Sequence, residues 1–153
     1  IGWDLKDTSA LVTVTLPMIR AATLSGAGDL NVSSATPEDT FAARLSGSGN
    51  MTVANSRAKA VDLTLTGAGN MKLRGVADTV KAQLTGSGSI DAVALTARDV
   101  TVGLTGAGNI SASASELATG TLSGVGNVDV VGPARCAVRK TGVGDVRCGV
   151  ARE

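Results

Sequence analysis

The sequence is poor in the side chains that most often carry out chemistry. It contains no His and no Tyr, one Trp, one Phe, two Cys and three Pro among 153 residues. The absence of His removes the commonest general base and the commonest metal ligand. The scarcity of aromatic rings leaves no platform for stacked bases, and no basic run is present to attract a phosphate backbone. The composition therefore argues against nucleic acid as a partner.

Long apolar segments and a targeting leader are also missing. No run of about 18 apolar residues occurs, so the sequence predicts no membrane-spanning helix. The chain opens at Ile1 without an initiator Met or a basic-plus-apolar leader. Either a signal segment has been removed or the chain has been shortened. With 14 basic and 13 acidic residues and 43% apolar residues, the composition is typical of one folded domain.

Glycine, in contrast, is abundant, and most of the 20 glycines belong to a repeat. The repeated unit is Leu, Ser or Thr, Gly-x-Gly, and then Asn or Asp. A period near 20 residues is typical of a solenoid, whose units bury their apolar faces only by stacking on neighbours. The seven copies begin at positions 24, 45, 65, 84, 104, 122 and 140, so their spacings are 21, 20, 19, 20, 18 and 18 residues.

Apolar and polar residues alternate on both sides of each Gly-x-Gly turn, as in Val61-Asp62-Leu63-Thr64-Leu65 and Met71-Lys72-Leu73. A period of two predicts strands with one buried face. Gly, Asn and Asp tolerate positive φ, so we expect several turn residues to adopt it. Each unit is then one coil that pairs with the coils above and below. The sequence predicts an all-β, single-domain parallel β-helix, or solenoid, of about seven coils.

We divide residues 1–153 into an N-terminal strand and cap at 1–23, seven coils at 24–148 and a tail at 149–153. The stretch from Leu11 to Leu16 predicts one more strand, which Pro17 ends. An open terminal coil exposes apolar core and unpaired strand edge. We therefore expect Trp3 and Leu5 to cover the first coil.

Residues at equivalent positions of successive coils have similar side chains, which predicts that these side chains stack into columns along the solenoid. The residue two before the first glycine is Leu in six coils, and the residue four after it is always apolar, so both should face the core. The residue directly before the glycine should form an outward hydroxyl column. The apolar set four after is Leu30, Met51, Met71, Ile90, Ile110, Val128 and Val146, and the hydroxyl set is Ser25, Ser46, Thr66, Thr85, Thr105, Ser123 and Thr141.

Charges alternate in sign along other columns. Like charges stacked in a parallel ladder repel, so alternation is what a stacked register prefers. Such exposed pairs contribute at most about 1 kcal/mol each. One predicted column is Asp39, Lys59, Asp78, Arg98 and Glu116, and the other predicted neighbours are Asp62 with Lys81, Lys72 with Asp91, and Asp129 with Arg147.

The repeated Leu-Ser/Thr-Gly-x-Gly-Asn/Asp unit, led in by Val14-Thr15-Leu16-Pro17, resembles the head GIN domain family of autotransporter adhesins. The resemblance extends from about Leu11 to Cys148. It implies a right-handed β-helix in a bacterial protein exported to the periplasm or cell surface, and it brings no catalytic residues. Two positions depart from the pattern, because Ser89 replaces Asn or Asp and Lys140 replaces Leu. Lys140 suggests that the last coil opens toward solvent.

Glycine-rich and β-helical repeats in proteins can bind calcium, bind phosphate or cleave polysaccharides. A calcium roll needs an acid in a nine-residue Gly-rich repeat. Here only two of the turns are followed by an acid, Asp29 or Asp145. A column of Asn side chains that cap the turns is therefore favoured over a calcium site. Gly-x-Gly alone lacks the remaining parts of a phosphate-binding loop. Asp91 and Asp129 share an outward column about 9.6 Å apart, near the separation of an inverting glycosidase pair. Lys72 and Arg147 flank them, however, which favours simple charge partners.

The two cysteines, Cys136 and Cys148, lie six residues before and six after Gly142, at inward positions above Ala118 and Val130. An exported protein meets oxidising conditions, so we expect a disulfide rather than two free thiols. Facing sheet walls lie about 10 Å apart, whereas a disulfide needs Cα atoms within roughly 7 Å. The final coil must therefore narrow.

From these observations we expect a non-catalytic bacterial envelope or cell-surface module that binds a glycan or a protein partner. We assign no catalytic, cofactor-binding or metal-binding residue, and no cofactor. Two alternatives remain open. One is a β-helical polysaccharide-degrading enzyme, and the other is a scaffold of identical chains that assemble end to end through their terminal coils.

Overall fold

A computed structural model describes residues 4–5, 11–15, 20–34 and 39–150 of the chain. Strands occupy most of this part, and none of it forms a helix long and apolar enough to cross a membrane. The predicted cap residue Trp3, the strand-ending Pro17 and residues 151–153 of the tail lie outside the described residues. The strands are β1 (Asp4–Leu5), β2 (Leu11–Thr15), β3 (Ala21–Gly26), β4 (Asp29–Ser34), β5 (Thr40–Gly47), β6 (Asn50–Gly67), β7 (Asn70–Gly86), β8 (Ser89–Gly106), β9 (Asn109–Val131), β10 (Arg135–Lys140) and β11 (Val143–Val150).

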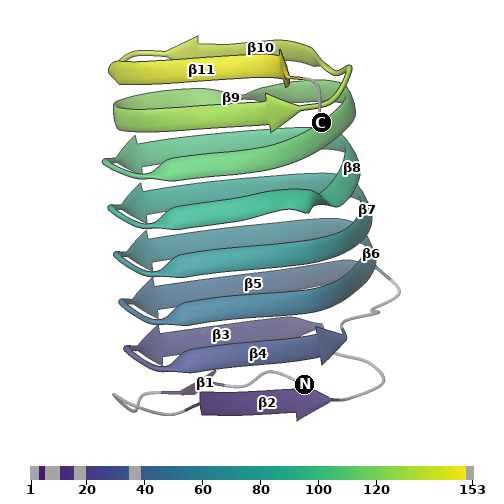
Figure 1. The fold of residues 1–153 in the computed structure, drawn as a ribbon, viewed down its shortest axis with the longest axis vertical. Helices are drawn as coiled ribbons and strands as arrows, with labels where there is room; N and C mark the ends of the chain where they lie inside the picture. Colours follow the sequence, from purple (N-terminus) through teal and green to yellow (C-terminus); the bar gives the residue numbers. More distant parts are fainter. Residues whose placement is uncertain (1–3, 6–10, 16–19, 35–38, 151–153) are drawn as a thin grey trace.

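The strands form a flattened solenoid with two walls, which confirms the predicted β-helix. Neighbouring coils pair in parallel, so that the first glycines stack from Gly26 through Gly124, with Gly142 above them. Seven stacked turns correspond to about six full circuits of the chain. In Figure 1 the near strands run to the right and the far strands to the left while the chain climbs, so the winding is right-handed.

Four surfaces of the solenoid follow from this winding. The upstream wall carries the strand residues just before each Gly-x-Gly, such as 61–66 and 80–85. The downstream wall carries those just after it, such as 50–53 and 70–73. The turn edge is the stack of Gly-x-Gly turns, and the far edge is the opposite bend, at residues such as 56–59 and 75–78. Both β1 and β2 extend the stack at its N-terminal end, where Leu5 pairs in register with Leu24.

The turn edge depends on glycine for two separate reasons. The first glycine of each turn from Gly26 to Gly124 has φ between 111° and 135°. The second glycine lies so close to the turn below that a Cβ on Gly69 would sit 2.1 Å from the carbonyl oxygen of Gly49. Our expectation that Asn or Asp would share the positive φ is wrong, because every described residue with positive φ is a glycine. The Asn instead begins the next strand, as Asn50 and Asn70 begin β6 and β7.

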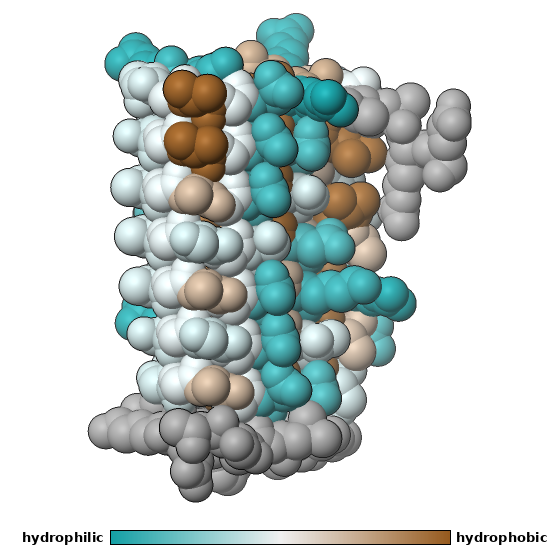
Figure 2. All heavy atoms as spheres, turned by 60° about the vertical axis from the view of Figure 1, so that its left-hand side comes forward, coloured by the Kyte–Doolittle hydropathy of each residue, from teal (hydrophilic) through white to brown (hydrophobic). Residues whose placement is uncertain are grey.

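These asparagines form a side-chain ladder along the turn edge, as the sequence predicted. The Nδ2 of Asn50 donates to Asp29 Oδ1 at 2.8 Å, and the Nδ2 of Asn70 donates to Asn50 Oδ1 at 3.1 Å. Higher up, the backbone N–H of Asn127 donates to Asn109 Oδ1 at 3.2 Å. Ser89 lies between Asn70 and Asn109 in register, and the hydrophilic column in Figure 2 is interrupted once along its length. The ladder therefore stabilises the stacking of turns, with a break at Ser89.

The predicted apolar columns fill the space between the walls. Leucines two before the first glycine are at most 1% exposed from Leu24 to Leu122, and the column four after the glycine is equally buried from Leu30 to Val128. In the last coil, Val146 is only partly buried, because no coil covers it among the described residues. The hydroxyl column faces outward as predicted, with Thr66, Thr85 and Thr105 exposed.

The last coil carries the predicted disulfide. Cys136 and Cys148 pair in register with Ala118 and Val130, and the two cysteines are bonded with their Cα atoms 6.1 Å apart. The coil thus narrows well below the usual separation of about 10 Å between packed sheets. Lys140 is exposed beside Leu122, in agreement with the expectation that this end opens toward solvent.

Candidate functional site

The charge column at the far edge agrees with the predicted register. Lys59 Nζ lies 3.5 Å from Asp39 Oδ1, and Arg98 Nε lies 3.5 Å from Glu116 Oε1. The pairing of Ala58 with Ala77 and of Ala60 with Thr79 places Asp78 next to Lys59 on the same edge. These side chains are well exposed, so each pair contributes at most about 1 kcal/mol to stability.

The two carboxylates considered for polysaccharide cleavage lie between cations, as expected. Asp91 pairs in register with Lys72 on one side and Ser111 on the other, and Asp129 pairs with Arg147. Asp91 Oδ1 also accepts a hydrogen bond from the backbone N–H of Val93 at 3.2 Å. Within the described ranges, no group of three or more acidic or cysteine residues gathers where a metal ion could be held.

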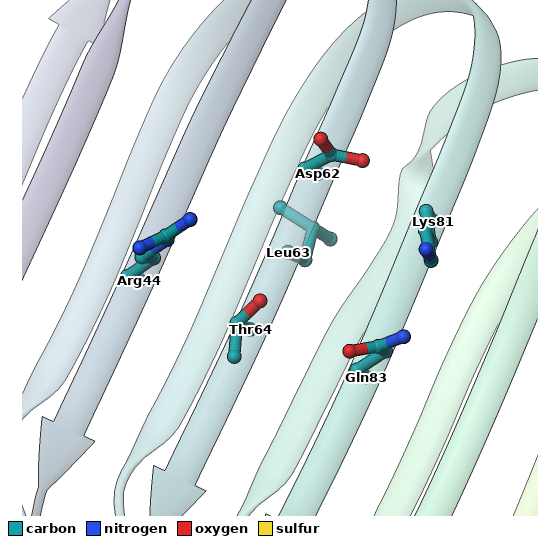
Figure 3. Close-up of a pocket in the computed structure, with 6 residues that line it drawn as sticks. All are labelled: Arg44, Asp62, Leu63, Thr64, Lys81 and Gln83. Carbon is teal, nitrogen blue, oxygen red and sulfur yellow. The ribbon is translucent and has the colours of Figure 1, made fainter.

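The upstream wall holds a shallow polar pocket, which Figure 3 shows. Its volume is about 190 Å³, and it opens across three adjacent strands of β5, β6 and β7. We call it the upstream pocket. Its floor includes the backbone of Leu63, whose side chain is buried in the core. The residues that line it are Arg44, Asp62, Leu63, Thr64, Lys81 and Gln83.

Register places the polar groups of the upstream pocket in two neighbouring columns. Asp62 pairs with Lys81, as the sequence predicted, and Thr64 lies between Arg44 and Gln83. Two cations, a carboxylate, a hydroxyl and an amide thus face solvent within a few strand spacings of about 4.8 Å. Such a set both donates and accepts hydrogen bonds, which suits a ligand with many hydroxyl or amide groups.

Arg44, Thr64 and Gln83 were not singled out from the sequence. They occupy the position three before the first glycine, where coils carry Thr23, Arg44, Thr64, Gln83, Gly103, Thr121 and Arg139. Polar residues at an outward position are ordinary on a solvated wall, so this column gave no signal of its own. A comparison of this column with the neighbouring column, which holds Asp62 and Lys81, could have revealed the polar cluster of the upstream pocket.

The turn edge changes character toward the C-terminal end. Figure 2 shows the middle residues of the Gly-x-Gly turns as a stripe that becomes apolar near one end of the stack. Val125 and Val143 lie side by side there and are 58% and 73% exposed, where the turns below carry Ala or Ser. Two valines form a small patch, well below the size that marks a partner surface by itself.

Comparison with known proteins agrees with the fold and the repeat. A crystal structure described as "a putative adhesin" from Bacteroides fragilis is 25% identical, with a TM-score of 0.79 over 86% of this chain and 61% of that chain. A "Putative lipid binding protein" from Parabacteroides distasonis, 19% identical, has a TM-score of 0.75 over 84% of this chain and 61% of its own, and this likeness concerns the fold alone. This chain thus spans less than two thirds of either structure.

No curated protein matches the sequence. Residues 3–134 match the family described as "Putative auto-transporter adhesin, head GIN domain". The match covers most of the 153 residues and includes six of the seven Gly-x-Gly turns. The chain therefore belongs to this head GIN domain family.

Proposed function

We propose that the protein is a non-catalytic binding module, exported to the bacterial periplasm or cell surface, that holds a glycan on its upstream wall. The upstream pocket carries this proposal. Its donors and acceptors come from strands that are hydrogen-bonded on both sides, so their spacing is set before a ligand arrives. A preorganised surface loses less conformational entropy on binding than a mobile loop does. The adhesin family and the adhesin-like structural neighbour support a surface-binding role.

We expect Thr64→Arg to weaken glycan binding at least about tenfold, because a long cation in the middle of the upstream pocket displaces the ligand from its partners. Thr64 is half-buried and outward, so the substitution should leave the fold intact. The measurement is a glycan array, followed by titration of the glycans that the wild-type protein retains. Ser111→Arg on the downstream wall is the matched control, since it adds the same charge at another half-buried outward position. Equal binding by both variants, or retention of no glycan by the wild type, would contradict the proposal.

The C-terminal end favours a second candidate, the assembly of identical chains end to end. Both β10 and β11 pair with β9 on one side, and no described strand pairs with their other side. Free strand edges are templates for pairing with another chain. If chains stack through this edge, sedimentation velocity should show a mass that rises with concentration. A single monomer mass across the range would remove this candidate.

A further inference from the structure

The downstream wall has a hollow at a place where the coil length changes. The coil that starts at Gly67 has 19 residues, whereas the coils on both sides have 20. The missing residue falls near Arg74. On the side of the coil below, two residues, Ala54 and Asn55, lie opposite the single residue Arg74. On the side of the coil above, the register shifts again, between Lys72 and Arg74. Both shifts lie next to Arg74, and β-bulges of this kind often re-aim side chains beside functional sites.

The hollow has a volume of about 690 Å³. We call it the downstream hollow. Lys72 and Arg74 both point outward into it, because they alternate with the buried Leu73 on one strand. Their Cα atoms are therefore about 6.6 Å apart by strand geometry. The residues that line the hollow are Thr52, Ala54, Asn55, Lys72 and Arg74.

The polar groups that line the hollow are rich in donors. Arg and Lys only donate hydrogen bonds, and the amide of Asn55 and the hydroxyl of Thr52 can also donate. The ion pairs formed within 39–150 use Lys59 and Arg98, so neither Lys72 nor Arg74 has a described carboxylate within 4.0 Å. The nearest acid in register is Asp91, and one of its oxygens accepts the N–H of Val93. Among the described residues, the hollow therefore presents two cations that form no ion pair, and the acid that shares a register position with one of them, Lys72, is Asp91.

We propose that the downstream hollow binds the oxyanion groups, sulfate or carboxylate, of an acidic polysaccharide. Charge-assisted hydrogen bonds from Arg and Lys are the usual way in which proteins hold such groups, and a guanidinium can engage two oxygens at once. The exposed Arg57 follows the bulge at Ala54–Asn55 and extends the basic surface along the coil below. A polymer with repeated charges can contact the hollow and Arg57 together. This site is separate from the upstream pocket and does not depend on it.

A lipid surface is a weaker candidate for the same hollow. Surfaces that insert into membranes combine cations with large apolar or aromatic side chains. Near the hollow the described residues offer only Val76, which is 54% exposed, as a large exposed apolar side chain. The other large exposed apolar residues, Leu117, Val125 and Val143, belong to later coils. An open, rigid and polar hollow is better matched to a hydrated polysaccharide.

The test measures binding of dextran sulfate, polygalacturonate and neutral dextran to the whole chain by isothermal titration calorimetry. Lys72→Gln with Arg74→Gln should weaken binding of the acidic polymers at least about tenfold, since two charge-assisted contacts are lost. Arg135→Gln with Arg139→Gln is the control, because it removes two exposed cations, four residues apart, from one strand, β10. The control should stay within about twofold, and circular dichroism should show both variants folded. Higher salt should weaken wild-type binding.

Each result decides the proposal. Binding of dextran sulfate alone or of polygalacturonate alone, when it depends on Lys72 and Arg74, supports the site and identifies its anion. An equal loss in both double variants would mean that only diffuse charge attracts the polymer, and the site would be rejected. Rejection also follows if neither acidic polymer binds, or if vesicles of phosphatidylglycerol bind through Lys72 and Arg74 while the polymers do not. Loss of acidic-polymer binding in Thr64→Arg but not in the Lys72 and Arg74 variant would move the activity to the upstream pocket.

Discussion

Replacing Gly106 with Ala is expected to lower the free energy of unfolding by about 4 kcal/mol or more, among the largest effects of any single substitution. Gly106 has a φ of 123°, a conformation that residues with a Cβ rarely adopt and that costs about 1–3 kcal/mol by itself. The added Cβ would also lie 2.3 Å from the carbonyl oxygen of Gly86. That oxygen accepts the N–H of Ala107 at 2.8 Å, so it cannot withdraw without breaking the stack.

The matched control is Gly103→Ala, three residues earlier in the same strand. Gly103 has no positive φ, and a Cβ there would meet only Gln83 Cγ, at 3.7 Å, an ordinary contact. This substitution should change stability by less than about 1 kcal/mol, and it can stabilise by reducing the entropy of the unfolded chain. Urea denaturation followed by circular dichroism measures both variants. Equal stability of the two variants would show that the turn edge tolerates a Cβ and that the described packing is wrong.

Replacing both Cys136 and Cys148 with Ala is expected to destabilise the last coil by about 3 kcal/mol in the chain-entropy model. The bond spans 12 residues and joins both walls of a coil that, among the described strands, has a neighbour on only one side. Its apolar residues Val138 and Val146 are only partly buried, so packing alone holds this coil weakly. Hydrogen exchange should therefore become faster in residues 135–149, while the coils around Leu84 and Leu104 change little.

A reductant separates the effect of the bond from that of the side chains. Reduction should accelerate exchange in the wild-type protein and leave the double Ala variant unchanged. Intact mass after alkylation of the unfolded chain without reductant is the independent measurement. Two alkylated thiols would show that the bond does not form, and identical exchange in wild type and variant would show that it does not stabilise the coil.

The register of the stacked coils could be predicted from the sequence alone. Because every coil repeats the same turn, counting from the first glycine predicted which residues stack, which face the core and which charged residues pair in register, as with Asp62 and Lys81 or Lys72 and Asp91. The same counting predicted the register of Cys136 with Ala118 and of Cys148 with Val130. Local periodicity sufficed here, since parallel stacking of near-identical units leaves few other arrangements.

Where the repeat is imperfect, the local arrangement of the strands could not be predicted from the sequence. A spacing of 19 residues shows that one coil is shorter. Only the pairing of the strands shows that the missing residue lies beside Arg74, which lines the downstream hollow. The residues that line the upstream pocket likewise come from two neighbouring columns, and the sequence patterns were read along one column at a time. The φ values of the turn residues also came only from the structure. The backbones of neighbouring turns stack so closely that the positions with positive φ have no room for a Cβ, so Gly occupies them and Asn begins the next strand. These features arise from contacts between coils, and such contacts are not encoded in any one unit of the repeat.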